Sequence, residues 1–523
     1  MRIVSYNIGH DGQICLVENN KLVFSYEAEK DNNPRYSANS PSDLLNLLTS
    51  INNEYDAIAI SGWAKGHDPR NDPIDGGYLG LGYSTKPNNN NNNNNNNNMT
   101  WVYCSHELSH IICSYALSKH ADISDCYVLL LEGFIGSLYY INKGLQVKCL
   151  ENIIQSPGLR YSFAFGIADP HFNLPKGYCR LGDAGKMMAL AGLGNNSQTS
   201  RDEQHMLDYL IASSSPIDTF SKSDFVGSKY YNIGPHSQPF CDLAKKISNA
   251  LFEHIRLKIL PHIKKKIPLL ISGGCGLNCD WNRKWEESGL FSDVFVPPCT
   301  NDTGVAIGAA ALAQKLMTGR CGLEWSVYSG QPFILEQNST TRSSYSPSPL
   351  QPHTICKKIL EGEIICWIQG RCEIGPRALG NRSILASPFS KTTTQKLNKL
   401  KQRENYRPIA PICLETDAPL HFENCKSSKY MLSFYKVINP RLQAITHADG
   451  TARAQTITSE DNPTLYNLLK AFKKLSGTGV LCNTSLNFSG AGFINNRSDL
   501  EKFCTHNSIS TFVIDDIMYT KVE

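Results

Sequence analysis

Two stretches of the chain share one pattern of glycines, strands and turns, and this internal repeat limits the possible folds more than any other feature. The first, GHDGQICLVENNKLVFSYE, begins at Gly9, and the second, GFIGSLYYINKGLQVKCLE, begins at Gly133. Each has a G-x-x-G turn, an apolar stretch, a polar turn with asparagine and another apolar stretch, and each follows a predicted strand, RIVSYN or CYVLLLE. The pattern predicts two lobes that each begin with three meandering strands.

This duplication predicts an α/β fold whose N-terminal domain is a duplicated ribonuclease-H-like structure of the actin and sugar-kinase type. In that architecture the turns after the first strands face a nucleotide cleft. A chance similarity of two β-meanders is the simpler alternative. The later segment IPLLISGGCGLNC indicates a buried strand that enters a turn at Gly273 and Gly274. Consecutive glycines let backbone amides approach an anion closely, so we expect this turn to bind phosphate.

The length of 523 residues is too great for one hydrophobic core, so we expect two domains. Residues 336–353 are rich in Ser, Thr and Pro, which predicts a linker between one domain over 1–335 and a smaller one over 354–523. Eleven consecutive asparagines predict a disordered insertion at 86–100 within the first domain.

Charge and hydropathy exclude several classes of function. The net charge of +4 is small for this length, so no general field for nucleic acid or membranes is predicted. The first residues lack the long apolar core of a signal peptide, and no run of 18 apolar residues occurs. We therefore expect a cytoplasmic protein that has neither a nucleic-acid nor a membrane partner.

The stretch HELSH at residues 106–110 matches the zinc-protease pattern H-E-x-x-H. Ser105 is a favourable N-cap, and the apolar spacing that follows predicts a helix. His106 and His110 then lie one turn apart on one face, where a single metal ion can bridge them. In a protease, Glu107 would be the general base and a third ligand would be required.

Two carboxylates at predicted strand-end turns are candidates for the remaining ligands. Glu132 ends the strand CYVLLL, and Asp302 precedes a helix of small residues, where it could also be a simple N-cap. With the two histidines they form a mixed nitrogen and oxygen set that suits Fe(II), Mn or Zn. Because Glu132 belongs to a predicted nucleotide-cleft turn, this set argues against peptide hydrolysis.

A basic cluster lies between residues 371 and 407, where nine Lys or Arg residues face only Glu373 and Glu404. Gly and Pro punctuate its first part, GRCEIGPRALGNRS, which predicts a loop. Arginines on a rigid loop suit bidentate recognition of phosphate. Tyr406 is the single aromatic residue near the lysines, so base stacking is poorly supported and a polyanionic small molecule such as ATP is favoured.

Taken together, these motifs resemble the ATP-dependent O-carbamoyltransferases of antibiotic biosynthesis, most of all their 3-hydroxymethylcephem branch. The resemblance covers nearly the whole chain and rests on GHDG, EAEKDNNPRYS, HELSH, LLLEGFIG, DAGKMMALAGLG, SGGCGLNC, NDTGVAIGAA, GPRALGNRSIL, LKQRENYRPIAP, DGTARAQT and CNTSLN in this order. It implies that an α+β, YrdC-like C-terminal domain forms carbamoyl-adenylate from ATP and carbamoyl phosphate. The N-terminal domain would then pass the carbamoyl group to a hydroxyl of a small molecule, with a metal, Fe(II) above all, on the adenylate phosphate.

The resemblance also implies roles for individual residues. His106, His110 and Asp302 match the family's metal ligands, while Glu132 stands where many relatives have Asp. His10 matches the candidate base beside the acceptor hydroxyl, a role that suits the ordinary pKa of histidine.

Further residues are implied to bind substrates. Contacts to nucleotide or carbamoyl phosphate are expected from Arg377, Arg382, Lys401, Arg407, Arg453 and Asn483. Nucleotide contacts in the N-terminal cleft are expected from Gly133, Lys186, Gly273, Gly274 and Asn278. Arg35 and Tyr36 are candidates for binding the acceptor.

One departure from the family pattern concerns the segment after NTSLN. Relatives usually continue with a basic residue and then GEPI, whereas this chain reads FSGAGFI, with Ser489 and Ala491. If that basic residue binds carbamoyl phosphate, we expect either a lower affinity for the donor or a different choice of donor here. The alternatives to a transferase are a zinc peptidase built on HELSH and a non-catalytic nucleotide-binding protein. A monomer and a homodimer are both compatible with the sequence.

Overall fold

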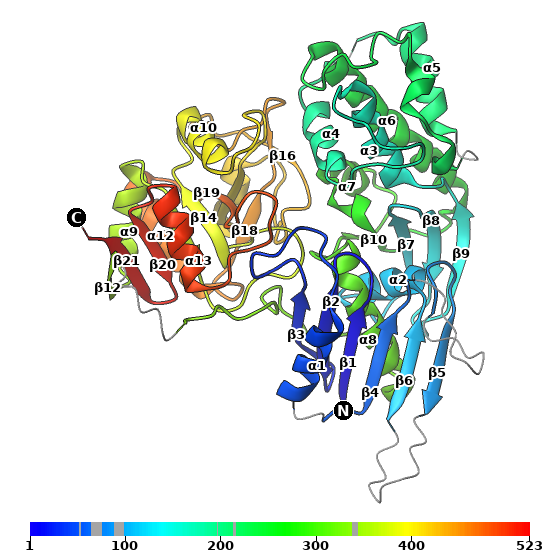
Figure 1. Cartoon of the computed structure of the whole chain (residues 1–523), viewed down its shortest axis with the longest axis horizontal. Coiled ribbons are helices and arrows are strands. Elements are labelled where there is room, and N and C mark those ends of the chain that lie inside the picture. Colours follow the sequence, from blue (N-terminus) through cyan, green and yellow to red (C-terminus); the bar gives the residue numbers. More distant parts are fainter. Residues whose placement is uncertain are drawn as a thin grey trace, which may run out of the picture. The chain divides into compact units, whose positions relative to one another are not determined.

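The computed structural model describes residues 1–51, 54–63, 76–87, 99–195, 197–212, 216–336 and 344–522 (Figure 1). The chain divides into two compact units. The first comprises Met1–Cys113 and Asp302–Glu523, and the second comprises Ser114–Asn301. The asparagine tract and part of the predicted linker, 337–343, lie outside the described residues.

A six-stranded sheet forms the N-terminal part of the first unit, in the order β3-β2-β1-β4-β6-β5. The first three strands are an antiparallel meander, and β4 and β6 run parallel to β1. The strands are β1 (Arg2–Asn7), β2 (Gln13–Glu18), β3 (Lys21–Glu27), β4 (Ala57–Ser61), β5 (Tyr83–Pro87) and β6 (Thr100–Cys104).

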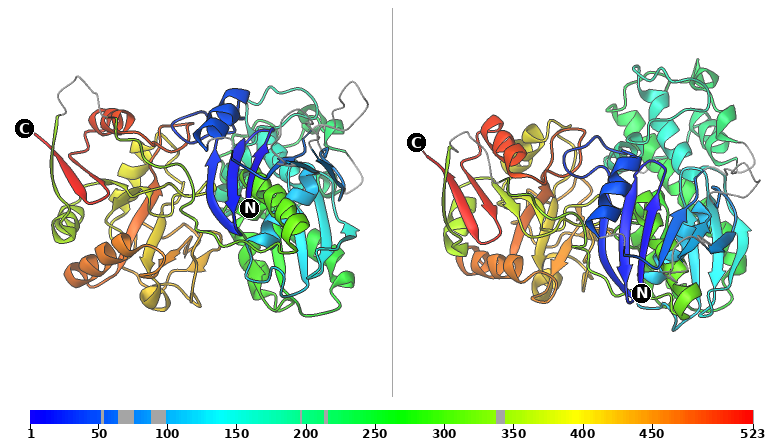
Figure 2. Two further views of the ribbon diagram at one scale, coloured as in Figure 1. Left: turned by 90° about the horizontal axis from the view of Figure 1, so that it is seen from below. Right: turned by 60° about the horizontal axis from the view of Figure 1, so that its bottom comes forward.

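Helices cover both faces of this sheet (Figures 1 and 2). On one face α1 (Pro41–Ser50) packs Leu47 against Val4 and Leu16. On the other lies α8 (Val305–Thr318), which packs against β1, β2 and β4. Every residue of β4 is buried as a result. The helix α2 (His106–Ala116) follows β6, and a short 3₁₀ turn, η5 (Asp302–Gly304), precedes α8.

The second unit contains a five-stranded sheet in the order β11-β10-β7-β8-β9. Its first three strands in sequence again form an antiparallel meander, and β10 pairs in parallel with β7. The strands are β7 (Cys126–Leu131), β8 (Gly136–Ile141), β9 (Val147–Asn152), β10 (Leu269–Ser272) and β11 (Val294–Phe295). The two predicted meanders are therefore confirmed, and each is extended by parallel strands beside its first strand.

Helices make up the rest of the second unit and pack mainly on one another around α3 and α6. They are α3 (Pro157–Ala168), α4 (Asp183–Ala191), α5 (Arg201–Ile211), α6 (Gln238–Ile259) and α7 (Cys279–Glu287). Single 3₁₀ turns lie at η1 (Ile217–Thr219), η2 (Lys222–Phe225), η3 (Leu260–His262) and η4 (Gly274–Leu277).

An eight-stranded mixed sheet forms the C-terminal part of the first unit, in the order β12-β21-β20-β13-β14-β19-β15-β18. Its strands are β12 (Tyr345–Pro349), β13 (Ile365–Ile368), β14 (Arg382–Ala386), β15 (Ala410–Leu414), β18 (Gln455–Ile457), β19 (Val480–Ser485), β20 (Thr511–Ile514) and β21 (Ile517–Lys521). A separate two-stranded ribbon pairs β16 (Tyr435–Lys436) with β17 (Thr451–Ala452).

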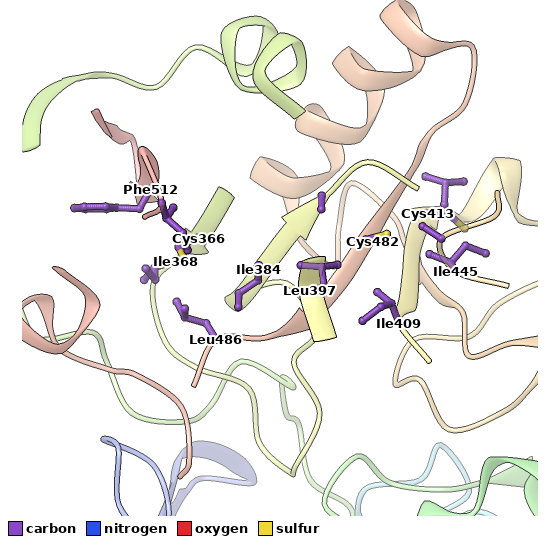
Figure 3. Close-up of a cluster of buried hydrophobic side chains, with 14 of the residues drawn as sticks. Cys366, Ile368, Ile384, Leu397, Ile409, Cys413, Ile445, Cys482, Leu486 and Phe512 are labelled. Atoms are coloured by element: carbon purple, nitrogen blue, oxygen red, sulfur yellow. The ribbon is translucent and has the colours of Figure 1, made fainter. Parts of the chain in front are cut away.

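Each face of this sheet has its own hydrophobic core, because side chains alternate along the strands. In β13, Cys366 and Ile368 join the core drawn in Figure 3, whereas Trp367 points into the opposite one. Helices α10 (Lys391–Leu400) and α13 (Arg497–His506) contribute to the first core, and α9 (Pro352–Leu360) and α12 (Pro463–Ser476) to the second. The short elements η6 (Glu415–Asp417) and α11 (Ala418–His421) complete the fold, which is mixed α/β.

The strand β12 corrects one sequence-based expectation, because it lies inside the segment predicted as a linker. It pairs with β21 at the edge of the eight-stranded sheet. Pro347 and Pro349 are the reason that the sequence indicated a linker here. A strand at the edge of a sheet tolerates proline, because it has no second neighbouring strand that needs the missing backbone N–H. Among the described residues, none of the helices has the length and apolar character needed to span a bilayer.

Candidate functional site

The helix α2 carries two of the predicted metal ligands at its start. It begins at His106, directly after Ser105, whose hydroxyl accepts a hydrogen bond from the backbone N–H of Leu108 at 3.2 Å. The predicted helix and its N-cap are thus confirmed. His106 and His110 are almost completely buried, and their Nε2 atoms lie 3.2 Å apart.

Asp302 completes a cluster with these two histidines within the first unit. Its Oδ1 lies 3.2 Å from Nε2 of His110 and 3.7 Å from Nε2 of His106. Burial alone would raise the pKa of Asp302, but the two histidines lower it below its ordinary value. Two imidazole nitrogens and a carboxylate that converge in a buried place are the donor set of a divalent cation, so the residues fit a metal.

Close packing of α2 against α8 produces this convergence. A β-carbon on Gly308 of α8 would lie 1.9 Å from the backbone oxygen of Ser109, so only glycine permits this approach. The ring of Tyr78 stacks on His106 with 4.5 Å between the ring centroids. Glu107 accepts a hydrogen bond from the backbone N–H of Gly80 at 2.8 Å. The carboxylate that completes the protease pattern therefore holds a loop.

His10, the predicted base, lies beside the same cluster in the turn after β1. Its Nδ1 is 3.0 Å from Oδ2 of Asp11 and 3.5 Å from Oδ2 of Asp302. Burial raises the pKa of Asp11, and the hydrogen bond from His10 opposes that rise. The side chain of His10 is 36% exposed, whereas both carboxylates are buried. The structure thus brings the predicted base to three of the four predicted metal ligands.

In the second unit, most predicted nucleotide contacts lie where β7 and β10 end. Glu132 is buried there, and its Oε1 accepts from the backbone N–H of Gly133 at 3.2 Å. Gly273 has a φ of 87°, and a β-carbon on it would lie 2.3 Å from the backbone oxygen of Leu131. Gly274 begins the adjoining turn η4.

The other two predicted contacts in this unit have protein partners. Asn278 is the N-cap of α7, since its side-chain oxygen accepts from the backbone N–H of Trp281. Lys186 lies on α4, and its Nζ pairs with Asp183 at 3.1 Å. Contacts of these residues with nucleotide stay predictions.

In the C-terminal part of the first unit, the loop 373–382 is organised around a buried carboxylate. Oε1 of Glu373 accepts from the backbone N–H groups of Leu379 and Asn381 at 2.7 Å and from that of Arg382 at 3.2 Å. Arg382 is itself fully buried. All five of its N–H bonds are directed at protein oxygens, those of Asn495, Gln369, Asn381 and Gly370. In this arrangement Arg382 braces the loop from within.

Lys401 also directs its hydrogen bonds at protein oxygens. Its Nζ donates to the backbone oxygens of Ser485 and Asn487, at 2.8 and 2.9 Å, and to the side-chain oxygen of Asn487. Burial, followed by the neighbouring charge of Arg403, holds the pKa of Lys401 well below its ordinary value. The segment that follows β19 is thus tied to the end of α10.

Three arginines near Lys401 form a cationic cluster. Burial lowers the pKa of Arg403 to about 9, and the charges of Arg407 and Arg453 add to the effect. Within the part of the chain that the structure describes, the buried Nε of Arg453 and the buried Oδ1 of Asn483 have no hydrogen-bond partner. Cations that destabilise one another in this way favour a bound anion. The sequence places Arg403 in the basic cluster between residues 371 and 407, but it does not single Arg403 out as a residue that binds the anion.

His447, which the sequence did not single out, lies near Arg453. Its Nδ1 is 3.1 Å from the hydroxyl oxygen of Thr451, and that hydroxyl donates to Asp449 at 2.7 Å. Nδ1 must therefore be the protonated nitrogen of a neutral ring, which leaves Nε2 as an acceptor. Burial lowers the pKa of His447 to about 4. A lone histidine without a spacing pattern gives no sequence signal of this kind.

The predicted acceptor contacts lie on the segment after β3. Nε of Arg35 is 3.6 Å from Oε2 of Glu29, and its backbone N–H donates to Gly490 at 3.2 Å. The guanidinium of Arg35 lies 5.5 Å from the ring centroid of Tyr36, which has a positive φ of 65°. Their role in acceptor binding stays a prediction.

The fold and these clusters define a mixed α/β protein with one site suited to a cation and another suited to an anion. Comparison with known proteins gives the family. The carbamoyltransferase N-terminus model matches residues 93–311, and the carbamoyltransferase C-terminus model matches residues 356–521.

Relatives extend the match to the full length of the chain. Two 3'-hydroxymethylcephem-O-carbamoyltransferases, from Amycolatopsis lactamdurans and Streptomyces clavuligerus, are 40% and 38% identical over 100% of this chain and 100% and 99% of their own. Nodulation protein U from Sinorhizobium fredii is 30% identical over 100% of this chain and 99% of its own. A solved ROK family protein from Streptococcus pneumoniae covers 61% of this chain and 100% of its own, at 12% identity and a TM-score of 0.30. The chain belongs to the carbamoyltransferase family and is an enzyme of that family.

Proposed function

We propose that this enzyme transfers the carbamoyl group of carbamoyl phosphate to a hydroxyl of an antibiotic-like small molecule. The full-length match to two cephem O-carbamoyltransferases carries the proposal. In the proposed route one water molecule, ATP and carbamoyl phosphate first give carbamoyl-adenylate, phosphate and pyrophosphate. The acceptor oxygen then attacks the carbamoyl carbon, and AMP leaves.

The two steps are assigned to different parts of the chain. Residues 1–335 would perform the transfer, and residues 354–523 would form the adenylate. The repeated strand order of the two N-terminal sheets supports a duplicated ribonuclease-H-like fold for the transfer part. A YrdC-like identity of the C-terminal part rests on the resemblance of its motifs, and its mixed sheet with helices on both faces is compatible with it.

His10 is the proposed base of the transfer step. Asp11 and Asp302 face its Nδ1, which favours a proton on that nitrogen and leaves Nε2 to accept the hydroxyl proton of the acceptor. His106, His110 and Asp302 would hold a divalent cation, Fe(II) or else Mn or Zn. The family resemblance adds Glu132 as the proposed fourth ligand. When bound, the cation would supply positive charge beside the adenylate phosphate.

The arginine cluster of the C-terminal part is the proposed site for carbamoyl phosphate and ATP. Arg377, Arg407 and Arg453 would bind phosphate, and the unpartnered Oδ1 of Asn483 suits an amide N–H of the carbamoyl group. Arg382 and Lys401 direct their side-chain N–H groups at protein oxygens. Their proposed role is therefore to hold the loops that surround this site.

A purified-protein assay tests the proposal. The protein is incubated anaerobically with Fe(II), ATP and carbamoyl phosphate, with or without a 3'-hydroxymethylcephem, and pyrophosphate and the carbamate are measured. We expect pyrophosphate that depends on carbamoyl phosphate and a carbamate that also requires the acceptor. Absence of both with every metal would refute the proposal. Cleavage of peptides that survives removal of ATP and is lost in Glu107→Gln would instead favour the peptidase alternative.

A further inference from the structure

Residues 27–39, which start at the last residue of β3 and are called the connecting segment below, touch the turn that carries His10. The backbone N–H of Ala28 donates to Gly12 at 2.7 Å, and the N–H of Gly12 donates to Ser37 at 2.8 Å. A β-carbon on Gly12 would lie 2.3 Å from the backbone nitrogen of Asn39. Both ends of the connecting segment are therefore fixed to the turn of the proposed base.

The same segment holds the loop 373–382 through a buried ion pair. Lys30 and Glu27 lie 3.1 Å apart, and neither is more than 1% exposed. Nζ of Lys30 donates to the backbone oxygen of Gly375 at 2.9 Å, and Oε1 of Glu27 accepts from the backbone N–H of Gly375 at 2.5 Å. One ion pair thus binds both backbone polar groups of a residue two positions before Arg377.

A third set of contacts joins the connecting segment to the loop after β19. The backbone N–H of Asn32 donates to Phe493, and that of Gly492 donates to Asn33, both at 2.9 Å. Nζ of Lys30 lies 4.0 Å from the ring centroid of Phe493. A β-carbon on Gly492 would lie 1.8 Å from the backbone oxygen of Glu29, so the approach of the two segments requires glycine.

The chemistry of this pair indicates a positioning role. A buried ion pair loses hydration that its mutual attraction only partly restores, and apolar residues of similar size are often as stable. Glu29 adds a second carboxylate at 4.0 Å from Nζ of Lys30, and Arg35 faces Glu29. Lys30 thus contacts two carboxylates, a backbone oxygen and an aromatic ring at once. We infer that this geometry fixes the orientation of the segments around Lys30 more than it stabilises the fold.

We propose that the Glu27–Lys30 pair is a positioning device that sets the loop 373–382 against the His10 turn and so couples formation of carbamoyl-adenylate to carbamoyl transfer. The proposal rests on the proposed function, in which Arg377 on this loop binds an anionic substrate. Displacing Gly375 would move Arg377 away from the phosphate while leaving the reacting groups unchanged.

The test uses the full-length double variant Glu27→Gln/Lys30→Met. It removes the hydrogen bond from Lys30 to the backbone oxygen of Gly375. Lys30→Met alone would leave the buried Glu27 carboxylate without Lys30, and the second substitution avoids this. We expect the KM for carbamoyl phosphate in pyrophosphate release to rise about tenfold while kcat changes little, because a small misplacement weakens binding of the anion. Carbamate formed per pyrophosphate released should fall as well. The matched control is Glu363→Gln/Lys358→Met, which removes a 2.9 Å Lys–Glu pair elsewhere in the same unit.

The outcomes separate this proposal from the function on which it rests. Wild-type protein without pyrophosphate release that depends on carbamoyl phosphate would refute the proposed function. A folded double variant with wild-type KM and wild-type coupling, beside an active wild type, would overturn the positioning role alone. If the double variant does not fold, Glu27→Gln by itself keeps an acceptor for Gly375. It should raise the KM about threefold through the weakened pair, and an unchanged KM would again overturn the role.

Discussion

Nε2 of His110 lies 3.2 Å from Oδ1 of Asp302, although 192 residues separate the two in the sequence. The contact exists because α2 starts where β6 ends and α8 starts just after Asp302, and the two helices meet at Gly308. The candidate metal site is therefore a product of helix packing as much as of its ligands.

Gly308→Ala should disturb this site without touching a ligand. The added methyl group would meet the backbone oxygen of Ser109 at 1.9 Å, so the helices must separate. We expect a loss of stability of about 1–3 kcal/mol, typical of overpacking, together with weaker retention of metal. Thermal unfolding and metal content measure the two effects. Gly182→Ala is the control, since no atom lies within 4 Å of its added methyl group. Equal metal retention in wild type and Gly308→Ala would show that helix spacing does not control the site.

His110→Ala should abolish stoichiometric binding of a divalent metal. It removes the nitrogen that contacts both His106 and Asp302 and leaves too few donors for tight binding. The measurement is metal content by mass spectrometry after anaerobic loading with Fe(II), Mn or Zn and removal of excess ion. His171→Ala serves as the control, because that histidine lies at the surface. Retention of one metal per chain in His110→Ala would place the metal elsewhere.

His10→Gln should separate the two proposed reactions. Glutamine keeps a polar side chain in the turn but cannot take a proton, so carbamate formation should fall at least about a hundredfold. Pyrophosphate release that depends on carbamoyl phosphate should persist, because the proposed function assigns that step to the C-terminal part. Both products are followed in one reaction by chromatography. Parallel loss of the two products would contradict a role confined to the transfer step.

Local sequence patterns predicted the secondary structure around the site, but they could not predict which way individual side chains point. The helix at His106 and the two meanders follow from spacing and alternation within short stretches, so they could be predicted. The roles of Arg382 and Lys401 depend on which oxygens surround them, such as those of Gly370 and Ser485. Those oxygens lie 12 and 84 positions away in the sequence, and a basic motif does not reveal whether its cations face protein or ligand. His447 was missed for a different reason: its partner Thr451 is close in sequence, but a lone histidine has no spacing pattern that marks it.

Arg382→Lys should destabilise the protein even though the charge is kept. Lysine has three donors in place of five and cannot bind Asn495 and Gly370 in one plane, so buried oxygens lose their partners. We expect a loss of about 2–4 kcal/mol in the unfolding free energy. Arg497→Lys, at a partly exposed pair with Glu501, should change stability much less. Similar losses in the two variants, compared by denaturant titration, would argue against the bracing role.

The stability of the wild-type protein should depend on pH through Glu27, and the variant Glu27→Gln should lack this dependence. Burial raises the pKa of Glu27 from 4.5 to about 7, with Lys30 opposing the rise. The folded protein therefore holds this proton more tightly than the unfolded chain does. Its contribution is fully present below pH 4.5 and is lost as the pH rises through 7, a change of roughly 3 kcal/mol.

The measurement is the difference in unfolding midpoint between wild type and Glu27→Gln across pH 4 to 8. The variant is expected to be close to wild type in stability at low pH, where the wild-type carboxyl is neutral like the amide, and to become the more stable of the two as the pH rises through 7, because only wild type loses the contribution of the bound proton. Glu18→Gln, which alters a carboxylate at the partly exposed pair with Arg2, is the control. A constant difference for Glu27→Gln would mean that Glu27 is ionised throughout, and that Lys30 compensates its burial completely.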